Sequence, residues 1–107
     1  MNIIGIIRQE ILSNPILIFM KGSPSQPKCN FSGNAVAALM SANLPFAHVD
    51  ISQSIEIQQA LPKISDWPTF PQVYINGELI GGCDITCEMF EKGELKKMID
   101  EAVSAKA

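Results

Sequence analysis

The first apolar positions of the chain recur at the spacing of one helix face: Ile3, Ile4, Ile7, Ile11 and Leu12. This spacing predicts a helix over residues 3–12. Asn14 and Pro15 follow, and they end the helix because the residue before a proline is pushed out of the α region. Residues 16–20 are then continuously apolar and bounded by turn residues, which predicts a short buried strand.

A second helix is predicted after residue 30, with apolar positions at Phe31, Ala35, Val36, Leu39 and Met40. We expect it to end near Asn43, and residues 47–51 to form a second short strand. Because a helix separates the two strands, they form a βαβ unit with a parallel pair. Ser54 is expected to cap a third helix, which Pro62 should bend or end.

The remaining elements follow from turn signals. Asn76-Gly77 between residues 72–75 and 78–80 predicts a β-hairpin. Asp84 is expected to cap a helix that runs to Phe90, and Gly93 to interrupt it. A last helix over residues 95–103 carries Met98, Ile99, Ala102 and Val103 on one side.

Composition narrows the class of protein. A chain of 107 residues, 47% hydrophobic, suits one domain over residues 1–107 with a packed core. The net charge of −3 and the lack of a basic block argue against nucleic-acid binding.

The longest apolar stretch is far below the ~20 residues that span a bilayer. No signal sequence is recognisable. Three cysteines fit a reducing compartment, so we expect a cytoplasmic protein.

Cys29 carries the strongest chemical signal. It lies between a Gly/Pro-containing loop and the start of the second predicted helix, where free N–H groups and the helix dipole stabilise a thiolate. Such settings lower the cysteine pKa from about 8.5 to roughly 3.5–7.5. The second cysteine of a C-x-x-C motif would stand at Ser32. Cys29 is therefore expected to be reactive without a neighbour for a disulfide, although a free cysteine can also be a small buried apolar residue.

The element order predicts an α/β fold with a four-stranded mixed sheet and helices on both faces. A reactive cysteine after the first strand, at the start of a helix, is typical of the thioredoxin-like version of this layout. Ligands of open α/β sheets gather at the C-terminal ends of the strands, where Cys29 falls.

Three segments carry a family resemblance: Met20–Pro24, Trp67–Gln72 and Gly81–Asp84. Together they resemble the monothiol glutaredoxins, in the right order and over nearly the whole chain. That family usually has Cys-Gly-Phe-Ser at the active cysteine, where this chain has Asn30 in place of glycine. The resemblance implies a thioredoxin-like glutaredoxin fold and glutathione binding. It also implies a [2Fe-2S] cluster held between two subunits and delivered to acceptor proteins, often together with BolA-like partners.

The resemblance also assigns roles to individual residues. Cys29 would be both the catalytic thiol and the cluster ligand, because two chains and two glutathiones supply four thiolates. Lys21 would pair with the glycyl carboxylate of glutathione. Thr69 and Phe70 would line the groove, with a cis bond between Phe70 and Pro71 and the Phe70 backbone pairing with the peptide.

The start of the fourth predicted helix would hold the other end of glutathione. Backbone N–H groups of Gly82 and Cys83 suit the γ-glutamyl carboxylate, and Asp84 could accept from the amine. Gln58 stands where the family usually has an arginine, so it can hydrogen-bond but carries no charge. Each residue has a plainer alternative: a solvated Lys21, core packing of Phe70, or an N-cap at Asp84.

Three further points stay open on the sequence. Cys83 and Cys87 could share a helix face as metal ligands, although zinc needs four. His48 is expected to be structural or exposed. The main function could also be glutathione-dependent thiol–disulfide exchange, at most weakly catalysed, or cysteine-independent binding of a partner.

Overall fold

A four-stranded sheet forms the centre of the computed structural model, which describes residues 2–41 and 46–106. Across the sheet the order is β2 (Ala47–Asp50), β1 (Ile16–Met20), β3 (Gln72–Ile75) and β4 (Glu78–Gly81). Strand β1 pairs parallel with β2 and antiparallel with β3, and β3 pairs antiparallel with β4. The predicted parallel pair, the hairpin and the mixed sheet are confirmed.

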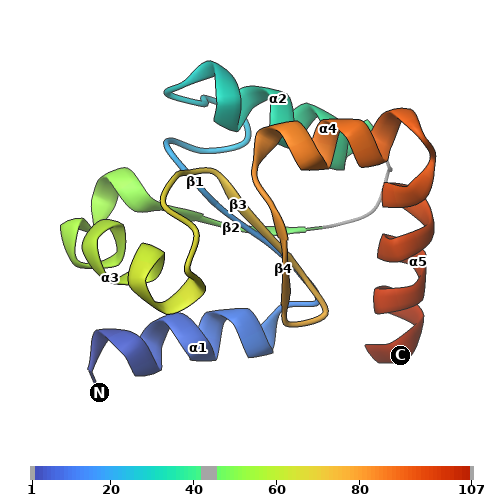
Figure 1. Ribbon diagram of the computed structural model, residues 1–107. Coiled ribbons are helices and arrows are strands. Elements are labelled where there is room, and N and C mark those ends of the chain that lie inside the picture. Colours follow the sequence, from blue (N-terminus) through green and yellow to red (C-terminus); the bar gives the residue numbers. More distant parts are fainter. Residues whose placement is uncertain (1, 42–45, 107) are drawn as a thin grey trace.

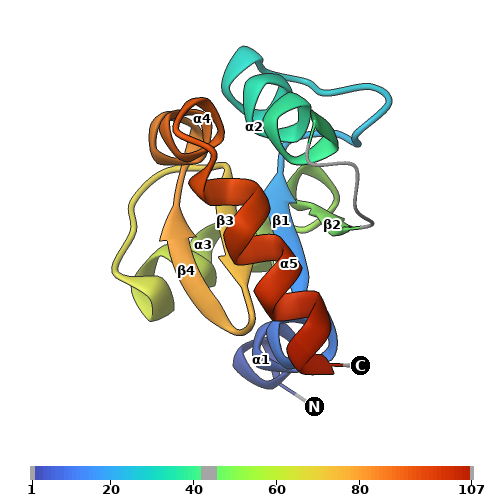
Figure 2. The same cartoon turned by 90° about the vertical axis from the view of Figure 1, so that its right-hand side faces the viewer.

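Helices cover both faces of the sheet (Figure 1). On one face lie α1 (Ile3–Ser13) and α3 (Ile55–Ser65), and on the other lie α2 (Asn30–Ser41), α4 (Cys83–Glu91) and α5 (Glu94–Lys106). The view turned by 90° shows α5 crossing in front of the strands (Figure 2). The thioredoxin-like architecture expected from the element order is therefore confirmed.

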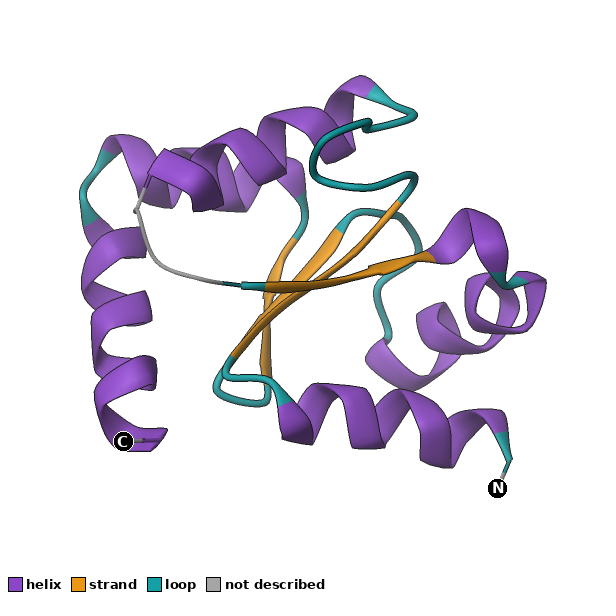
Figure 3. Ribbon diagram, turned by 180° about the vertical axis from the view of Figure 1, so that it is seen from behind, coloured by secondary structure: helices purple, strands orange, loops and turns teal. Residues whose placement is uncertain are grey.

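Strand β1 is buried on both faces, which explains its unbroken run of apolar residues. Ile16, Ile18 and Met20 pack into the core beneath α2 and α5, whereas Leu17 and Phe19 pack into the core beneath α1 and α3. Each such side chain stabilises the fold by roughly 1.5–3 kcal/mol relative to exposure. The position and direction of β1 are thus fixed, and with them the place where the chain leaves the strand (Figure 3).

Most helix boundaries follow local signals. Asn2 caps α1 by accepting from the N–H of Gly5 at 2.8 Å, and Ser54 caps α3 by accepting from that of Ile57 at 3.3 Å. The alternative that Pro62 ends α3 is wrong, because the helix continues to Ser65. Pro62 lies in the last turn, where the loss of one backbone hydrogen bond affects few residues.

Several predicted details need correction. The second strand stops at Asp50, because Ile51 begins a short 3₁₀-helix, η1 (Ile51–Gln53). Gly82 rather than Asp84 is the N-cap of α4, since the helix already starts at Cys83. The predicted end of α2 near Asn43, and the side chains of Ala102 and Val103, lie outside the described residues.

Two apolar residues of α2 face solvent: Phe31 is 62% exposed and Met40 58%. The other apolar positions of the helix, Ala35, Val36 and Leu39, are buried as the spacing predicted. Within the described part of the chain, no helix is long and apolar enough to cross a membrane.

Candidate active site

Cys29 lies immediately before the first residue of α2, and its sulfur takes the place of an N-cap acceptor. Cys29 Sγ accepts from the N–H of Ser32 at 3.3 Å and lies 3.2 Å from Ser32 Oγ. Ser32 is fully buried, and its Oγ also accepts from the N–H of Lys21 at 3.1 Å. One hydroxyl therefore joins the thiol to the chain leaving β1.

These contacts set the acidity of the thiol. Burial alone would raise the pKa of Cys29, but the hydroxyl and N–H of Ser32 lower it, and the Lys21 charge and the N–H of Phe31 add to this. The net result is a pKa below the ordinary value for cysteine. The thiol of Cys29 is therefore more acidic than an ordinary cysteine, which favours the thiolate form that nucleophilic and metal-binding cysteines use.

The pH dependence of Cys29 alkylation tests this arrangement. We expect the rate of iodoacetamide modification, followed by mass spectrometry of the Cys29 peptide, to rise with a midpoint below that of free cysteine. Ser32→Ala should move the midpoint upward because the thiolate loses its hydroxyl donor. Lys21→Gln should move it less, since Lys21 contributes less to the lowering. A midpoint unchanged in Ser32→Ala would contradict the role of the hydroxyl.

The loop between β1 and α2 is held by a carboxylate that sequence reasoning missed. Asp50 Oδ1 accepts from the N–H groups of Gly22 and Ser52, each at 2.9 Å. The hydroxyl of Ser52, these two N–H groups and the charge of Lys28 together lower the Asp50 pKa to about 2, against a smaller opposing effect of burial. The carboxylate is therefore ionised at neutral pH. The sequence gives no hint of this contact, because 28 residues separate Gly22 from Asp50.

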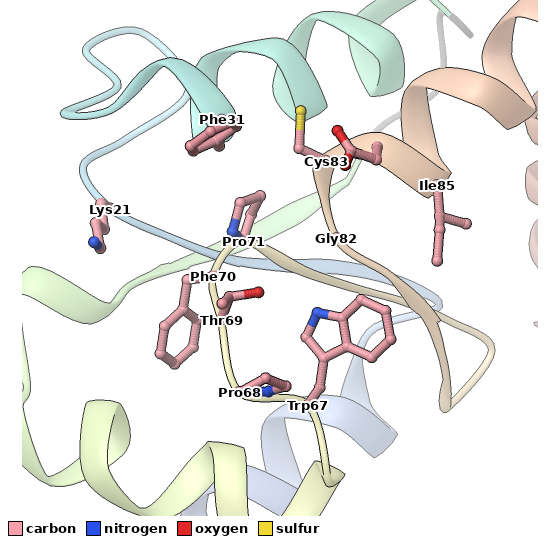
Figure 4. Close-up of a pocket in the computed structure, with 11 residues that line it drawn as sticks. Lys21, Phe31, Trp67, Pro68, Thr69, Phe70, Pro71, Gly82, Cys83 and Ile85 are labelled. Carbon is pink, nitrogen blue, oxygen red and sulfur yellow. The ribbon is translucent and has the colours of Figure 1, made fainter.

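A groove of about 620 Å³ lies beside the start of α2 (Figure 4). Six residues predicted for the site line it: Lys21, Thr69, Phe70, Gly82, Cys83 and Asp84. Figure 4 shows Lys21 on one side, Gly82 and Cys83 on the other, and the Thr69–Pro71 segment between them. The volume is within the range of small-ligand sites, roughly 300–1,000 Å³.

The floor of the groove is fixed by buried contacts. The bond between Phe70 and Pro71 is cis, as expected. Gln72 is fully buried, and its side-chain amide donates to the carbonyl of Trp67 at 3.0 Å and to that of Thr69 at 3.3 Å. Gln72 Oε1 accepts from the hydroxyl of Tyr74 at 3.1 Å. The segment that faces the ligand space is thereby tied to β3.

Each side of the groove offers groups that bind a carboxylate, and the α4 side also carries the carboxylate of Asp84. The N-cap of α4 is Gly82, which has no side chain to accept from the first N–H groups of the helix. Such N–H groups, with the helix dipole behind them, bind carboxylates. Lys21 supplies a cation on the opposite side. The groove therefore suits an extended molecule with a carboxylate at each end.

Comparison with known proteins agrees with this geometry. A family described as Glutaredoxin matches residues 16–80. A Haemophilus ducreyi protein named glutaredoxin 4 is 51% identical over 104 residues, which cover 97% of each chain. The chain belongs to the glutaredoxin family. Ser32, in place of a second cysteine, makes it a monothiol glutaredoxin.

Solved glutaredoxins have the same fold. The solution structure of reduced poplar apo GrxS14 superposes with a TM-score of 0.80 at 41% identity, over 94% of this chain and 92% of that one. The crystal structure of a buckwheat glutaredoxin–glutathione complex superposes with a TM-score of 0.80 at 27% identity, over 92% of this chain and 87% of that one.

Two predicted site residues lie outside the groove of this glutaredoxin. Cys29 lines a smaller hollow at the start of α2, together with Lys28 and Asn30. The side-chain amide of Gln58 donates to the carbonyl of Ile51 at 2.8 Å, so its N–H group is engaged in holding η1 against α3. Asn30 is the first residue of α2 and is not among the positive-φ residues, so this position does not need glycine's freedom.

Two aromatic residues complete the site. Phe31 and Trp67 line the groove, although the apolar spacing had placed Phe31 only as a helix residue. The sequence feature that could have predicted this is its position two residues after Cys29, because side chains in the first turn of a helix point back toward the preceding loop. Phe31 is exposed and lies at the edge of the groove, two residues after the thiol in the sequence (Figure 4).

Proposed function

We propose that this glutaredoxin binds glutathione in the groove and carries a [2Fe-2S] cluster to acceptor proteins. The observation that supports this most is a single activated thiol beside a groove with a cation on one side and an uncapped helix N-terminus on the other. Glutathione matches both parts. It has a carboxylate near each end and a sulfur in the middle.

The residues present fit such a ligand. Lys21 would pair with the glycyl carboxylate, and the N–H groups at the start of α4 with the γ-glutamyl carboxylate. Asp84, in the first turn of α4, would accept from the γ-glutamyl amine. The Phe70 backbone, which leads into β3, would pair with the cysteinyl unit like an added strand. The buckwheat glutaredoxin structure, named as a glutathione complex, supports this choice of ligand.

The cluster requirement follows from counting sulfur ligands. A [2Fe-2S] cluster takes four thiolates, and one chain with one glutathione supplies two. The proposed holo form is therefore a homodimer with two glutathiones. Ligands held without covalent bonds can leave, which suits a carrier. The exposed ring of Phe31 beside Cys29 offers a contact for the second subunit, for a BolA-like partner or for an acceptor protein. We place this role in a reducing compartment such as the cytoplasm.

Anaerobic reconstitution with iron, sulfide and glutathione tests the proposal. We expect a coloured product that elutes as a dimer and contains two iron ions and two glutathiones per dimer. Reconstitution without glutathione is the control, and it should give no stable colour because half of the ligands are missing. A colourless monomer in the complete mixture would contradict the proposal.

The lowered pKa of Cys29 also favours a second activity, monothiol exchange with glutathione. The thiolate attacks the glutathione sulfur of a mixed disulfide and releases the target thiolate. A second glutathione thiolate then attacks the glutathione sulfur of the disulfide with Cys29. This step releases glutathione disulfide and returns Cys29 to the thiolate. A deglutathionylation assay on the same preparation measures this activity separately from cluster assembly.

A further inference from the structure

The proposed function leaves one pair of sulfur atoms unexplained. Cys83, the first residue of α4, and Cys87, one turn later, lie on the same helix face with their sulfurs 3.9 Å apart. Both thiols are free and half-buried, so they remain accessible from outside. Cys83 borders the groove, and Cys87 lies between α2 and α4, where its thiol donates to the carbonyl of Asn34 at 3.7 Å.

Helix geometry decides between a disulfide and a shared metal ion. Residues four apart on a helix have Cβ atoms about 5–6 Å apart, whereas a disulfide requires roughly 3.5–4.5 Å. A disulfide would therefore distort the first turn of α4. Metal–thiolate bonds are about 2.3 Å long, so two sulfurs on one ion can be up to about 4.6 Å apart. The observed 3.9 Å lies below this limit, so rotation of the two side chains, without movement of the backbone, would bring the sulfurs to the spacing of an ion held by two ligands.

The number of available ligands decides which metal fits. The described residues contain no group of three or more His, Cys, Asp or Glu side chains that could hold an ion. A structural zinc site needs four ligands, so zinc does not fit. Soft thiolates select Cu(I), which is stable with only two or three sulfur ligands. We propose that Cys83 and Cys87 form a binding site for one Cu(I) ion, with both thiolates as ligands.

In the free protein, Cys83 is not set up as a nucleophile. Burial and the neighbouring Cys87 and Asp84 raise the pKa of Cys83 to about 11, so it is a neutral thiol at physiological pH. A protonated thiol is a poor nucleophile. Binding of Cu(I) therefore has to displace the proton of Cys83, and the cation then removes the repulsion that two adjacent thiolates would suffer.

Competition with a coloured chelator tests this site without reference to cluster chemistry. Protein free of glutathione is added anaerobically to the Cu(I) complex of bathocuproine disulfonate, and loss of the complex's colour reports copper transfer. We expect the wild type and Cys29→Ser to take up one ion each with the same Kd. Cys83→Ser, Cys87→Ser and Cys87→Ala should each raise the Kd by at least about a hundredfold.

The variants also separate this proposal from the proposed function. Cys87→Ser should still assemble the [2Fe-2S] cluster, because no proposed step there uses Cys87. Unchanged copper affinity in both Cys87 variants would overturn the copper site, and so would loss of binding in Cys29→Ser, which would place Cu(I) on Cys29. Formation of a Cys83–Cys87 disulfide under mild oxidation, with no copper uptake by the reduced protein, would overturn it in favour of a redox pair.

Discussion

Replacing Cys29 with serine is expected to abolish the visible absorbance that reconstitution with iron, sulfide and glutathione gives in the wild type. The physical reason is the number of sulfur ligands. In a cluster shared by two subunits, the substitution removes two of the four thiolates at once. A serine hydroxyl does not replace them, because it is protonated at neutral pH. We therefore expect iron and sulfide contents at background after desalting, and a monomer on size exclusion.

The control for this experiment is the matched substitution Cys87→Ser, which removes a thiol of the same type from α4. It should leave absorbance, iron content and dimer formation at the wild-type level. Full colour in Cys29→Ser would contradict the assignment of Cys29 as the cluster ligand. Loss of colour in both variants would indicate that Cys87 serves the cluster as well.

The second large effect is expected at Gly22, where alanine should lower the free energy of unfolding by about 3 kcal/mol. Gly22 has φ +92°, a conformation that side chains disfavour. An added Cβ would lie 2.5 Å from the carbonyl oxygen of Gln26 and 2.7 Å from the nitrogen of Lys28. Both are backbone atoms of the loop that leads to Cys29, so the loop itself must move. Urea denaturation measures the change.

Gly77→Ala is the matched control, because its φ of +83° is similar and, among the described residues other than its chain neighbours, an added Cβ would have no atom within 4 Å. It should cost only the strain of the positive φ, about 1 kcal/mol. The difference between the two variants isolates the close approach at Gly22. Equal losses would show that close packing of this loop contributes nothing to stability.

The elements that the sequence predicted well depend on local chemistry. The N-cap at Ser54, the turn at Asn76-Gly77 and the continuous apolar run of β1 each determine a structure within a few residues. The parallel pairing of β1 with β2 followed because a helix lies between them. These local signals were enough to predict the four strands and the helices on both faces.

The misses concern contacts between distant segments or competition between neighbouring residues. The carboxylate of Asp50 holds Gly22 from another strand, and a single sequence contains no signal for such a pair. Aspartate is a favoured N-cap residue, so Asp84 was expected to cap α4. Gly82 takes the N-cap position instead, and the helix starts at Cys83. The hydrogen bond from the side chain of Gln58 to the carbonyl of Ile51 likewise joins segments that the sequence pattern does not connect.

The buried hydroxyl of Ser32 has a consequence for how this chain could evolve. A change to cysteine would create a C-x-x-C pair in one step. It would also replace a strong hydrogen-bond acceptor by a weak one at the N–H of Lys21, inside a fully packed site. Gaining a second active-site thiol would thus weaken the hydrogen bond that holds the chain at the end of β1, so the two properties oppose each other at this position.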